Sequence, residues 1–205
     1  MAARLTRILV FAREPVAGKA KTRLIPALGP DGAARLARVM LGHALVEAAA
    51  ANVGPIELVG DPHPAAWSQP VQGMAISEQS GADLGERMGA AVERTLAQNE
   101  RATVTGTDCP GLNAARIAEA ARALETHDVA IIPATDGGYV LIGFRRFDRS
   151  IFAHVDWGKE AVLAATLRNI EALGWSIWQG EPLPDIDDSD DLKHVPATWL
   201  VDTER

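Results

Sequence analysis

Strand-like segments alternate with helix-like segments along this 205-residue sequence. Most of the strand-like segments are short and apolar, which is typical of strands that a sheet buries on both faces. They lie at residues 7–12, 56–60, 74–79, 102–107, 128–134, 139–144 and 176–180. Amphipathic patterns predict helices at residues 31–51, 84–98, 114–125 and 160–173, the first with Asp31 as its N-cap. The alternation predicts a three-layer α/β/α sandwich with a mainly parallel, mixed sheet, in a single domain over residues 1–205.

Charge is unevenly spread along the chain, whose formal net charge is −7. The first 23 residues carry a net charge of +5 and the remainder −12, with five Asp residues in the run "DIDDSDD" at 185–191. Nucleic-acid binding calls for a broad basic face, so this acidic composition argues against it. A local basic segment and a separate acidic cluster suit a small anion that is held together with a divalent cation.

The cysteine content and the hydropathy of the sequence indicate the cellular location that we expect. Cys109 is the only cysteine, which excludes an intrachain disulfide and a Cys-rich zinc site. No apolar run approaches the roughly 20 residues that cross a bilayer, so we expect no membrane span. The N-terminal run "ILVFA" is shorter than the apolar core of a signal peptide. We therefore expect a cytoplasmic protein.

Three polar segments follow predicted strands, at residues 13–23, 108–112 and 135–139. In open α/β sheets, ligands bind beyond the carboxyl ends of the strands, so these segments are predicted to meet at one site. The first of them holds Arg13, Gly18, Lys19, Lys21 and Arg23. Its glycine allows close backbone approach, and its cations suit phosphate oxygens. The segment matches neither a Walker A loop nor G-x-G-x-x-G, and a solvated basic loop is the alternative interpretation.

The other two segments supply candidate carboxylates. Asp108 ends an apolar strand in "GTDCPGL", where its oxygens suit a hard divalent cation, although it also suits a turn that caps the next helix. Asp136 precedes Gly137, Gly138 and Tyr139. It is placed to hold a sugar hydroxyl or a second metal, and a D-G turn is the alternative. We take Asp108 and Asp136 as the candidate catalytic residues.

The acidic run near the C-terminus contains one carboxylate that we expect to point inward. Asp187 follows the apolar Ile186, whereas most of the neighbouring Asp residues are expected at the surface. The sixth position of an EF-hand loop must be Gly, and Asp190 stands there, so this is not a calcium loop. A solvated acidic turn that caps a short helix from about Ser189 is the alternative.

Two further side chains have both a functional and a structural interpretation. Arg87 would lie in the first turn of a helix, where the helix dipole disfavours a cation, so it either faces a ligand or lies at the surface. Trp157 precedes a predicted helix in "DWGKEAV" and either stacks on a base or sugar or fills the core.

Taken together, these motifs resemble a bacterial family of small GT-A-like nucleotide-diphospho-sugar transferases associated with radical-SAM or arsenosugar clusters. The matching blocks are the segment from Phe11 to Leu24 that ends in "KTRL", "LGERM" at 84–88, "GTDCPGL" at 106–112, "PATDGGYVLIG" at 133–143, "DWGKEAVL" at 156–163 and "DIDDSDDL" at 185–192. A similar skeleton occurs in the 2-phospholactate guanylyltransferases. The resemblance spans nearly the whole chain.

The resemblance implies a role for each motif. Gly18, Lys19, Lys21 and Arg23 would hold phosphates, while Asp108 and Asp187 would be the metal carboxylates for Mg²⁺ or Mn²⁺. Lys159 departs from the family pattern, in which we expect Thr or Ser after "WG". Its added positive charge leaves the choice of acceptor open. We place the acceptor or donor sugar beside Gly137, Gly138, Tyr139, Trp157 and Lys159, and the nucleotide beside the basic segment and Arg87.

Three functions remain open at this point. The first is metal-dependent group transfer from a nucleotide sugar to a small-molecule acceptor. The second uses the same site as a nucleotidyltransferase, in which a small phosphorylated acid attacks an NTP and pyrophosphate leaves. The third is a nucleotide-binding protein without catalysis, against which the full set of basic and acidic elements argues. The oligomeric state is not predicted.

Overall fold

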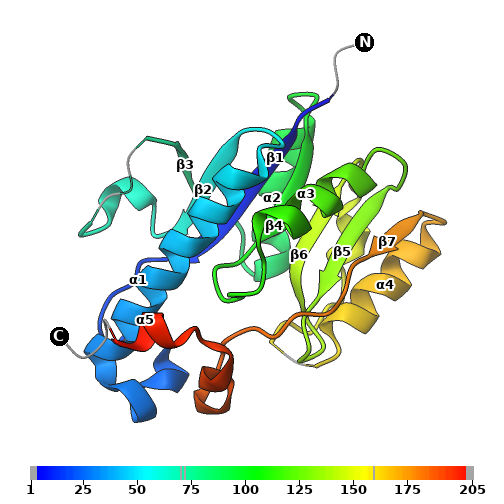
Figure 1. The fold of residues 1–205 in the computed structure, drawn as a ribbon. Helices are drawn as coiled ribbons and strands as arrows, with labels where there is room; N and C mark the ends of the chain where they lie inside the picture. Colours follow the sequence, from blue (N-terminus) through cyan, green and yellow to red (C-terminus); the bar gives the residue numbers. More distant parts are fainter. Residues whose placement is uncertain (1–3, 70, 72, 159, 202–205) are drawn as a thin grey trace.

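One mixed sheet forms the centre of the protein (Figure 1). The computed structural model describes residues 4–69, 71, 73–158 and 160–201. Over these residues, the sheet has seven strands in the order β3-β2-β1-β4-β6-β5-β7. The strands are β1 (Thr6–Arg13), β2 (Ile56–Asp61), β3 (Ala75–Glu78), β4 (Arg101–Thr105), β5 (Val129–Pro133), β6 (Tyr139–Phe144) and β7 (Ile177–Gln179). Only β6 runs antiparallel to its neighbours, which confirms the expected mainly parallel, mixed sheet.

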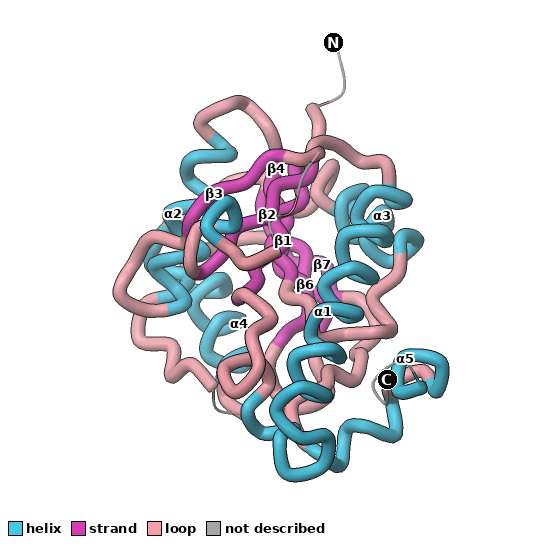
Figure 2. The backbone as a smooth tube through the Cα atoms, turned by 90° about the vertical axis from the view of Figure 1, so that its left-hand side faces the viewer, coloured by secondary structure: helices cyan, strands magenta, loops and turns pink. Residues whose placement is uncertain are grey.

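Helices cover both faces of the sheet, as Figure 2 shows. The α-helices are α1 (Ile25–Ala51), α2 (Leu84–Leu96), α3 (Ala114–Ala123), α4 (Val162–Ala172) and α5 (Ala197–Val201). Short 3-10 helices lie at η1 (Thr22–Leu24), η2 (Pro64–Ala66), η3 (Arg149–Phe152) and η4 (Ser189–His194). The apolar stripes of α1 and α3 pack on one face, and those of α2 and α4 on the other. The three predicted layers are therefore present.

The central strands supply the core because both of their faces are covered. Ile8 and Val10 of β1 pack under α1 and α3, whereas Leu9 on the same strand packs under α2. All three side chains are fully buried. This alternation is the reason that β1 reads as a continuous apolar run in the sequence.

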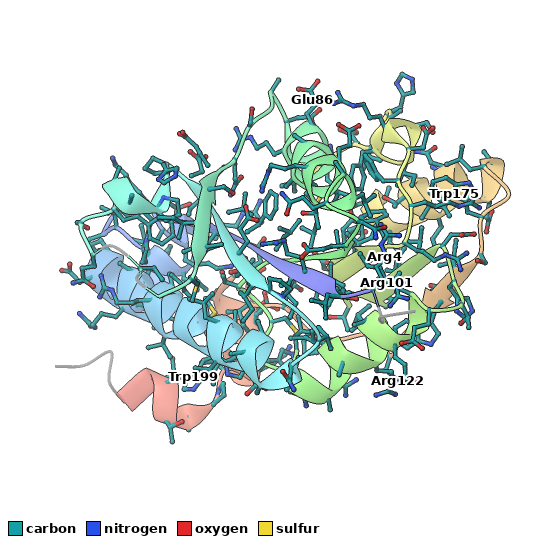
Figure 3. The ribbon with its side chains drawn as sticks, turned by 90° about the horizontal axis from the view of Figure 1, so that it is seen from above. Arg4, Glu86, Arg101, Arg122, Trp175 and Trp199 are labelled. Carbon is teal, nitrogen blue, oxygen red and sulfur yellow. The ribbon has the colours of Figure 1, made fainter. Side chains whose placement is uncertain are left out.

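A third, smaller core joins the start of α1 to the C-terminal segment. Leu24, Leu36 and Met40 pack there with Ile186 and other residues near the C-terminus. In Figure 1 this segment leaves β7, passes the ends of the central strands and reaches α1. Trp199, labelled in Figure 3, packs against His43 of α1 with tilted rings whose centroids are 4.9 Å apart. The segment is therefore fixed beside the carboxyl ends of the strands.

The prediction that the first helix begins after Asp31 as its N-cap was wrong. The helix begins at Ile25 and includes Asp31, because a first turn precedes a kink at Gly29. Gly29 has φ +70°, which glycine adopts at no steric cost, and Pro30 restarts the helix behind it. The remaining predicted elements are present with small shifts at their ends. Among the described residues, no helix is both long and apolar enough to cross a membrane.

Candidate active site

A cleft of about 690 Å³ opens at the carboxyl ends of β1 and β4. The chain leaves β1 toward β2 on one side, whereas β4 lies on the other, so the cleft lies at the point where the strand order reverses. This is the usual ligand position in doubly wound sheets. Its charged lining consists of Arg13, Lys19, Lys21, Arg23, Asp83, Arg87, Asp108 and Asp187. Of the predicted site residues, the structure thus brings all but one of the phosphate candidates together with both metal candidates.

The basic segment that follows β1 forms one wall of the cleft. Lys19 and Arg23 are exposed, whereas the Lys21 side chain is only 11% exposed. Gly18 does not line the cleft, but its φ of +76° forms the turn that brings the Lys19 N–H to the Val16 carbonyl oxygen. Arg23 pairs with Asp187 across the cleft. The wall therefore combines exposed cationic side chains with one that is largely buried.

Asp108 follows β4 and is anchored through its own backbone. Its carbonyl oxygen accepts a 2.8 Å hydrogen bond from the N–H of Ile186, and its Oδ2 lies 2.9 Å from the Lys21 ammonium. Its Oδ1 accepts a 3.0 Å hydrogen bond from the Thr107 hydroxyl, and the side chain is 45% exposed, so the carboxylate remains accessible from the cleft. The C-terminal segment is also bonded to the end of β5, where Thr135 donates to the Leu183 carbonyl oxygen at 3.0 Å. These bonds carry Asp187 to the cleft.

Arg87 lies at the opposite wall, where Asp61 orients it. The guanidinium donates to Asp61 Oδ2 at 3.2 Å and to the Gly81 carbonyl oxygen at 3.1 Å. Asp61 ends β2 and also lies 4.0 Å from Nε of Arg13, whose side chain is 77% exposed. Arg87 therefore faces the cleft rather than open solvent. The orienting role of Asp61 was missed in the sequence, where it stands at the start of a Pro-rich loop.

The turn between β5 and β6 holds Asp136 next to the cleft but outside its lining. Asp136 is exposed, and its Oδ1 accepts a 2.8 Å hydrogen bond from the N–H of Gly138. Gly137 has φ +94°, and a Cβ at this position would lie 2.0 Å from the Glu160 carbonyl oxygen. The turn is thus packed tightly against the chain that precedes α4. The hydrogen bond from Gly138 is the one expected for the D-G turn that the sequence offered as the alternative to a ligand-binding role. It uses Oδ1 of Asp136 and leaves Oδ2 for other contacts.

The predicted aromatic residues occupy different positions. The Tyr139 ring lines the cleft, while its hydroxyl is buried beside Thr166, and this burial raises the pKa of the phenol. Trp157 packs edge-on against Phe152 at 5.7 Å and against Gly85 at the start of α2, outside the cleft lining. Lys159, the remaining acceptor-side candidate, lies outside the described residues.

Asp185 is a half-buried carboxylate beside the cleft that sequence reasoning missed. Burial raises its pKa to about 6, and the negative charges of Asp136, Asp108 and Asp187 contribute to the rise. Asp185 thus lies near three other carboxylates, two of which are paired with Lys21 and Arg23. The sequence indicated Asp187 as the inward-facing carboxylate, but the structure leaves Asp187 exposed at the cleft and half-buries Asp185, with the buried Ile186 between them. The sequence itself holds no signal that separates these two carboxylates.

The oxygen donors in this region suit a hard divalent cation. Mg²⁺ in transferases commonly takes one or two protein carboxylates and completes its shell with water and substrate phosphates. Asp108 and Asp187 would supply such a pair, although each is now matched by Lys21 or Arg23. Within the described ranges, no three His, Cys, Asp or Glu side chains are grouped as a metal site on their own.

The sheet order, and the cleft at the carboxyl ends of β1 and β4, are those of the nucleotide-diphospho-sugar transferase-like α/β fold. A solved structure from Desulfovibrio desulfuricans G20, whose name assigns it provisionally to the nucleotide-diphospho-sugar transferases, is 32% identical with a TM-score of 0.85. The match covers 94% of this chain and 87% of that chain. The family model that matches residues 44–159 is described as uncharacterized protein conserved in bacteria (DUF2064). The chain therefore belongs to the DUF2064 family.

Two more distant structures share the fold. CMP:2-keto-3-deoxy-manno-octonic acid synthetase, solved with CTP, is 12% identical with a TM-score of 0.58, and the match covers 98% of this chain and 99% of that chain. Rv0371c from Mycobacterium tuberculosis H37Rv, solved with manganese, is 16% identical with a TM-score of 0.51, over 93% and 97% of the two chains. A search of curated proteins found no match to this chain.

Proposed function

We propose that this protein is a metal-dependent transferase that moves a group from a sugar nucleotide to a small acceptor. The observation that carries the proposal is one cleft in which cationic side chains face two carboxylates. Lys19, Lys21 and Arg23 follow β1, while Asp108 follows β4 and Asp187 reaches the same cleft from the C-terminal segment. The 32% identity to the Desulfovibrio protein supports the same class.

The cationic side chains would bind the phosphates of the donor. Lys19 and Arg23 are exposed at the mouth of the cleft and can move toward an anion, whereas Asp61 holds Arg87 in place. Fixed positive charge at these positions stabilises the negative charge that develops on the leaving phosphate. A divalent cation held by Asp108 and Asp187 would reduce the charge repulsion of the diphosphate and stabilise the leaving oxygens.

We assign the acceptor side to the turn between β5 and β6. Asp136 is exposed there, three residues before the cleft-lining Tyr139, and its carboxylate would orient a hydroxyl group of the acceptor. Gly137 and Gly138 keep the turn narrow beside it. Tyr139 lines the cleft beside this turn, where a sugar or base would pack against it. Trp157 would have an indirect role, because it packs against Gly85 and stabilises the start of α2 without lining the cleft.

A nucleotidyltransferase is the second candidate, and the charge of the cleft favours it. The lining includes five cationic side chains and three carboxylates, an excess that suits a triphosphate. In this reaction a phosphate or carboxylate oxygen of a small acid attacks the α-phosphorus of an NTP. The bond to the β-phosphate breaks, and pyrophosphate leaves with the electron pair.

A thermal-shift screen with Mn²⁺ or Mg²⁺ separates the candidates. The panel contains UDP-, GDP-, ADP- and dTDP-sugars and the four NTPs. A ligand at 100 times its Kd adds about 2.7 kcal/mol to stability, which raises the Tm by roughly 5–10 °C in a protein of this size. We expect a metal-dependent shift with one sugar nucleotide. A shift with an NTP alone, followed by pyrophosphate release, would favour the nucleotidyltransferase, and binding without turnover would favour the non-catalytic alternative.

A further inference from the structure

The ammonium group of Lys21, in the wall of the cleft, lies against Asp108, one of the two carboxylates that are proposed to hold the metal. Nζ is 2.9 Å from Asp108 Oδ2 and donates a 2.5 Å hydrogen bond to the carbonyl oxygen of Ile186. The side chain is 11% exposed, in contrast to the exposed Lys19 two residues earlier. Lys21 thus already neutralises the carboxylate that the proposed function assigns to a divalent cation.

The backbone of Lys21 has a conformation that is unfavourable for a residue with a Cβ, so other contacts must stabilise it. Lys21 has φ 45° and ψ 50°, the left-handed region that residues with a Cβ rarely adopt. It directly precedes η1, and its side chain does not cap that helix. The contacts of its ammonium group with Asp108 and Ile186 hold the side chain in place. Loss of these contacts would allow the loop to take a more common conformation.

We propose that Lys21 occupies the cation position on Asp108 in the ligand-free protein, and that metal and nucleotide displace it together. This inference rests on the proposed function. A divalent cation on the same carboxylate oxygen would repel the ammonium group, so Lys21 must leave as the cation binds. The released ammonium is then available to phosphate oxygens of the incoming nucleotide. Lys21 is a positioning residue that couples the two binding events.

The neighbouring ion pair between Arg23 and Asp187 also joins a cation of the basic segment to a proposed metal carboxylate, but it is more exposed. Arg23 and Asp187 are 68% and 51% exposed, and exposed ion pairs contribute little to stability. The Lys21–Asp108 pair is more enclosed, so it is the pair whose opening sets the metal affinity. A cation that binds alone must displace Lys21 without giving it a new partner. With nucleotide present, the phosphates supply that partner, which predicts positive coupling between the metal and the nucleotide.

Calorimetry with Mn²⁺ alone, without nucleotide, tests this competition. Lys21→Gln removes the competing ammonium, and we expect it to bind Mn²⁺ about tenfold more tightly than the wild type, as expected for the loss of one charge-assisted contact. Lys19→Gln removes the same charge from the same loop without touching Asp108, and its Mn²⁺ affinity should stay within about threefold of the wild type. Equal changes in the two variants would show a general charge effect and overturn the proposal.

Amine acetylation of the wild type provides a readout that does not depend on a variant. Protein is treated with an acetylating reagent with and without saturating Mn²⁺, and modification of each lysine is measured by mass spectrometry. Mn²⁺ should raise the modification of Lys21 several-fold and leave the exposed Lys193 unchanged. If Mn²⁺ binds and Lys21 modification does not rise, the exchange is wrong and the proposed function stands. If neither the wild type nor Lys21→Gln binds Mn²⁺, both proposals fail.

Discussion

The main-chain N–H of Ile186 donates a 2.8 Å hydrogen bond to the carbonyl oxygen of Asp108. This bond joins the C-terminal segment to the end of β4 and places one carboxylate on each side of it, Asp185 half-buried and Asp187 exposed. The acidic run therefore enters the cleft at a defined register instead of remaining a solvated turn along its whole length.

Asp108→Asn is expected to abolish metal-dependent turnover while the fold is retained. The amide keeps the size of the side chain and loses the charge that a cation requires. Even substitutions of residues that only support a metal ligand lower activity by 10–100-fold, so we expect a loss of at least about 100-fold. Turnover and circular dichroism are measured on the same preparation. Asp190→Asn, in the same acidic run but outside the cleft lining, is the control, and normal turnover in Asp108→Asn would overturn the metal assignment.

Arg87→Ala is expected to weaken nucleotide binding by about tenfold or more, because a charge-assisted contact to phosphate is lost. Arg122→Ala is the matched control, since Arg122 lies at the last turn of α3, away from the cleft (Figure 3). Affinity is measured by calorimetry with the donor that the thermal-shift screen identifies. Equal affinities of the two variants would place the phosphates elsewhere.

Gly137→Ala is expected to destabilise the protein by about 3 kcal/mol or more. The new Cβ would lie 2.0 Å from the Glu160 carbonyl oxygen, and φ +94° is unfavourable for alanine. Gly174→Ala is the comparison, because Gly174 has φ +66° and no atom of the described residues lies within 4 Å of the point that its Cβ would occupy. That change carries only the backbone penalty of about 1–2 kcal/mol. Urea unfolding measures both, and equal losses would show that the turn can move away from Glu160.

Asp128 links β5 to the chain after α4, and its loss should make stability less dependent on acid pH. Burial alone would raise its pKa, but hydrogen bonds from Arg145, Ser176 and Arg146 outweigh burial and lower it. The folded-state pKa lies below the unfolded value of about 3.9, so the stabilisation is full above pH 4 and is lost as the pH falls below it. Asp128→Asn should lower the stability at pH 7 by about 3 kcal/mol.

The corresponding change in Tm is about 6–12 °C at pH 7 and should shrink toward pH 3. Thermal unfolding at both pH values measures it. Glu93→Gln is the control, because Glu93 forms an exposed pair with Arg149, for which a loss of at most about 1 kcal/mol is expected. A difference between wild type and Asp128→Asn that is the same at pH 7 and pH 3 would contradict the assigned ionisation.

The fold could be predicted from the sequence because its strands are buried on both faces. A short, continuous apolar run such as that of β1 is typical of a strand that is covered on both faces. The structure confirms the three layers and the mixed sheet. The start of α1 could not be predicted, because Gly29 and Pro30 also suit a loop. The extra turn is stabilised by long-range packing, in which Ile25 and Leu28 contact the core cluster that contains Ile186. The association with radical-SAM clusters stays a prediction.

The site was predictable in its residue types and less so in its pairings. The carboxyl ends of parallel strands meet at one edge, so Lys21 and Asp108 were expected to be near each other. Their direct contact was not, since it depends on a left-handed backbone at a lysine. Asp185 was missed because crowded carboxylates look alike in sequence, and only the burial of Ile186 distinguishes among them.

The bond from Lys21 to Ile186 spans 165 positions of the chain. Closing so large a loop carries a high entropic penalty, and such long-range contacts form only when most of the intervening chain is already ordered. The sheet can therefore assemble before the cleft has its second carboxylate. During refolding, the ability to bind ligand should therefore appear after most of the secondary structure has formed. An intermediate with a native-like sheet would exist before the binding site is complete.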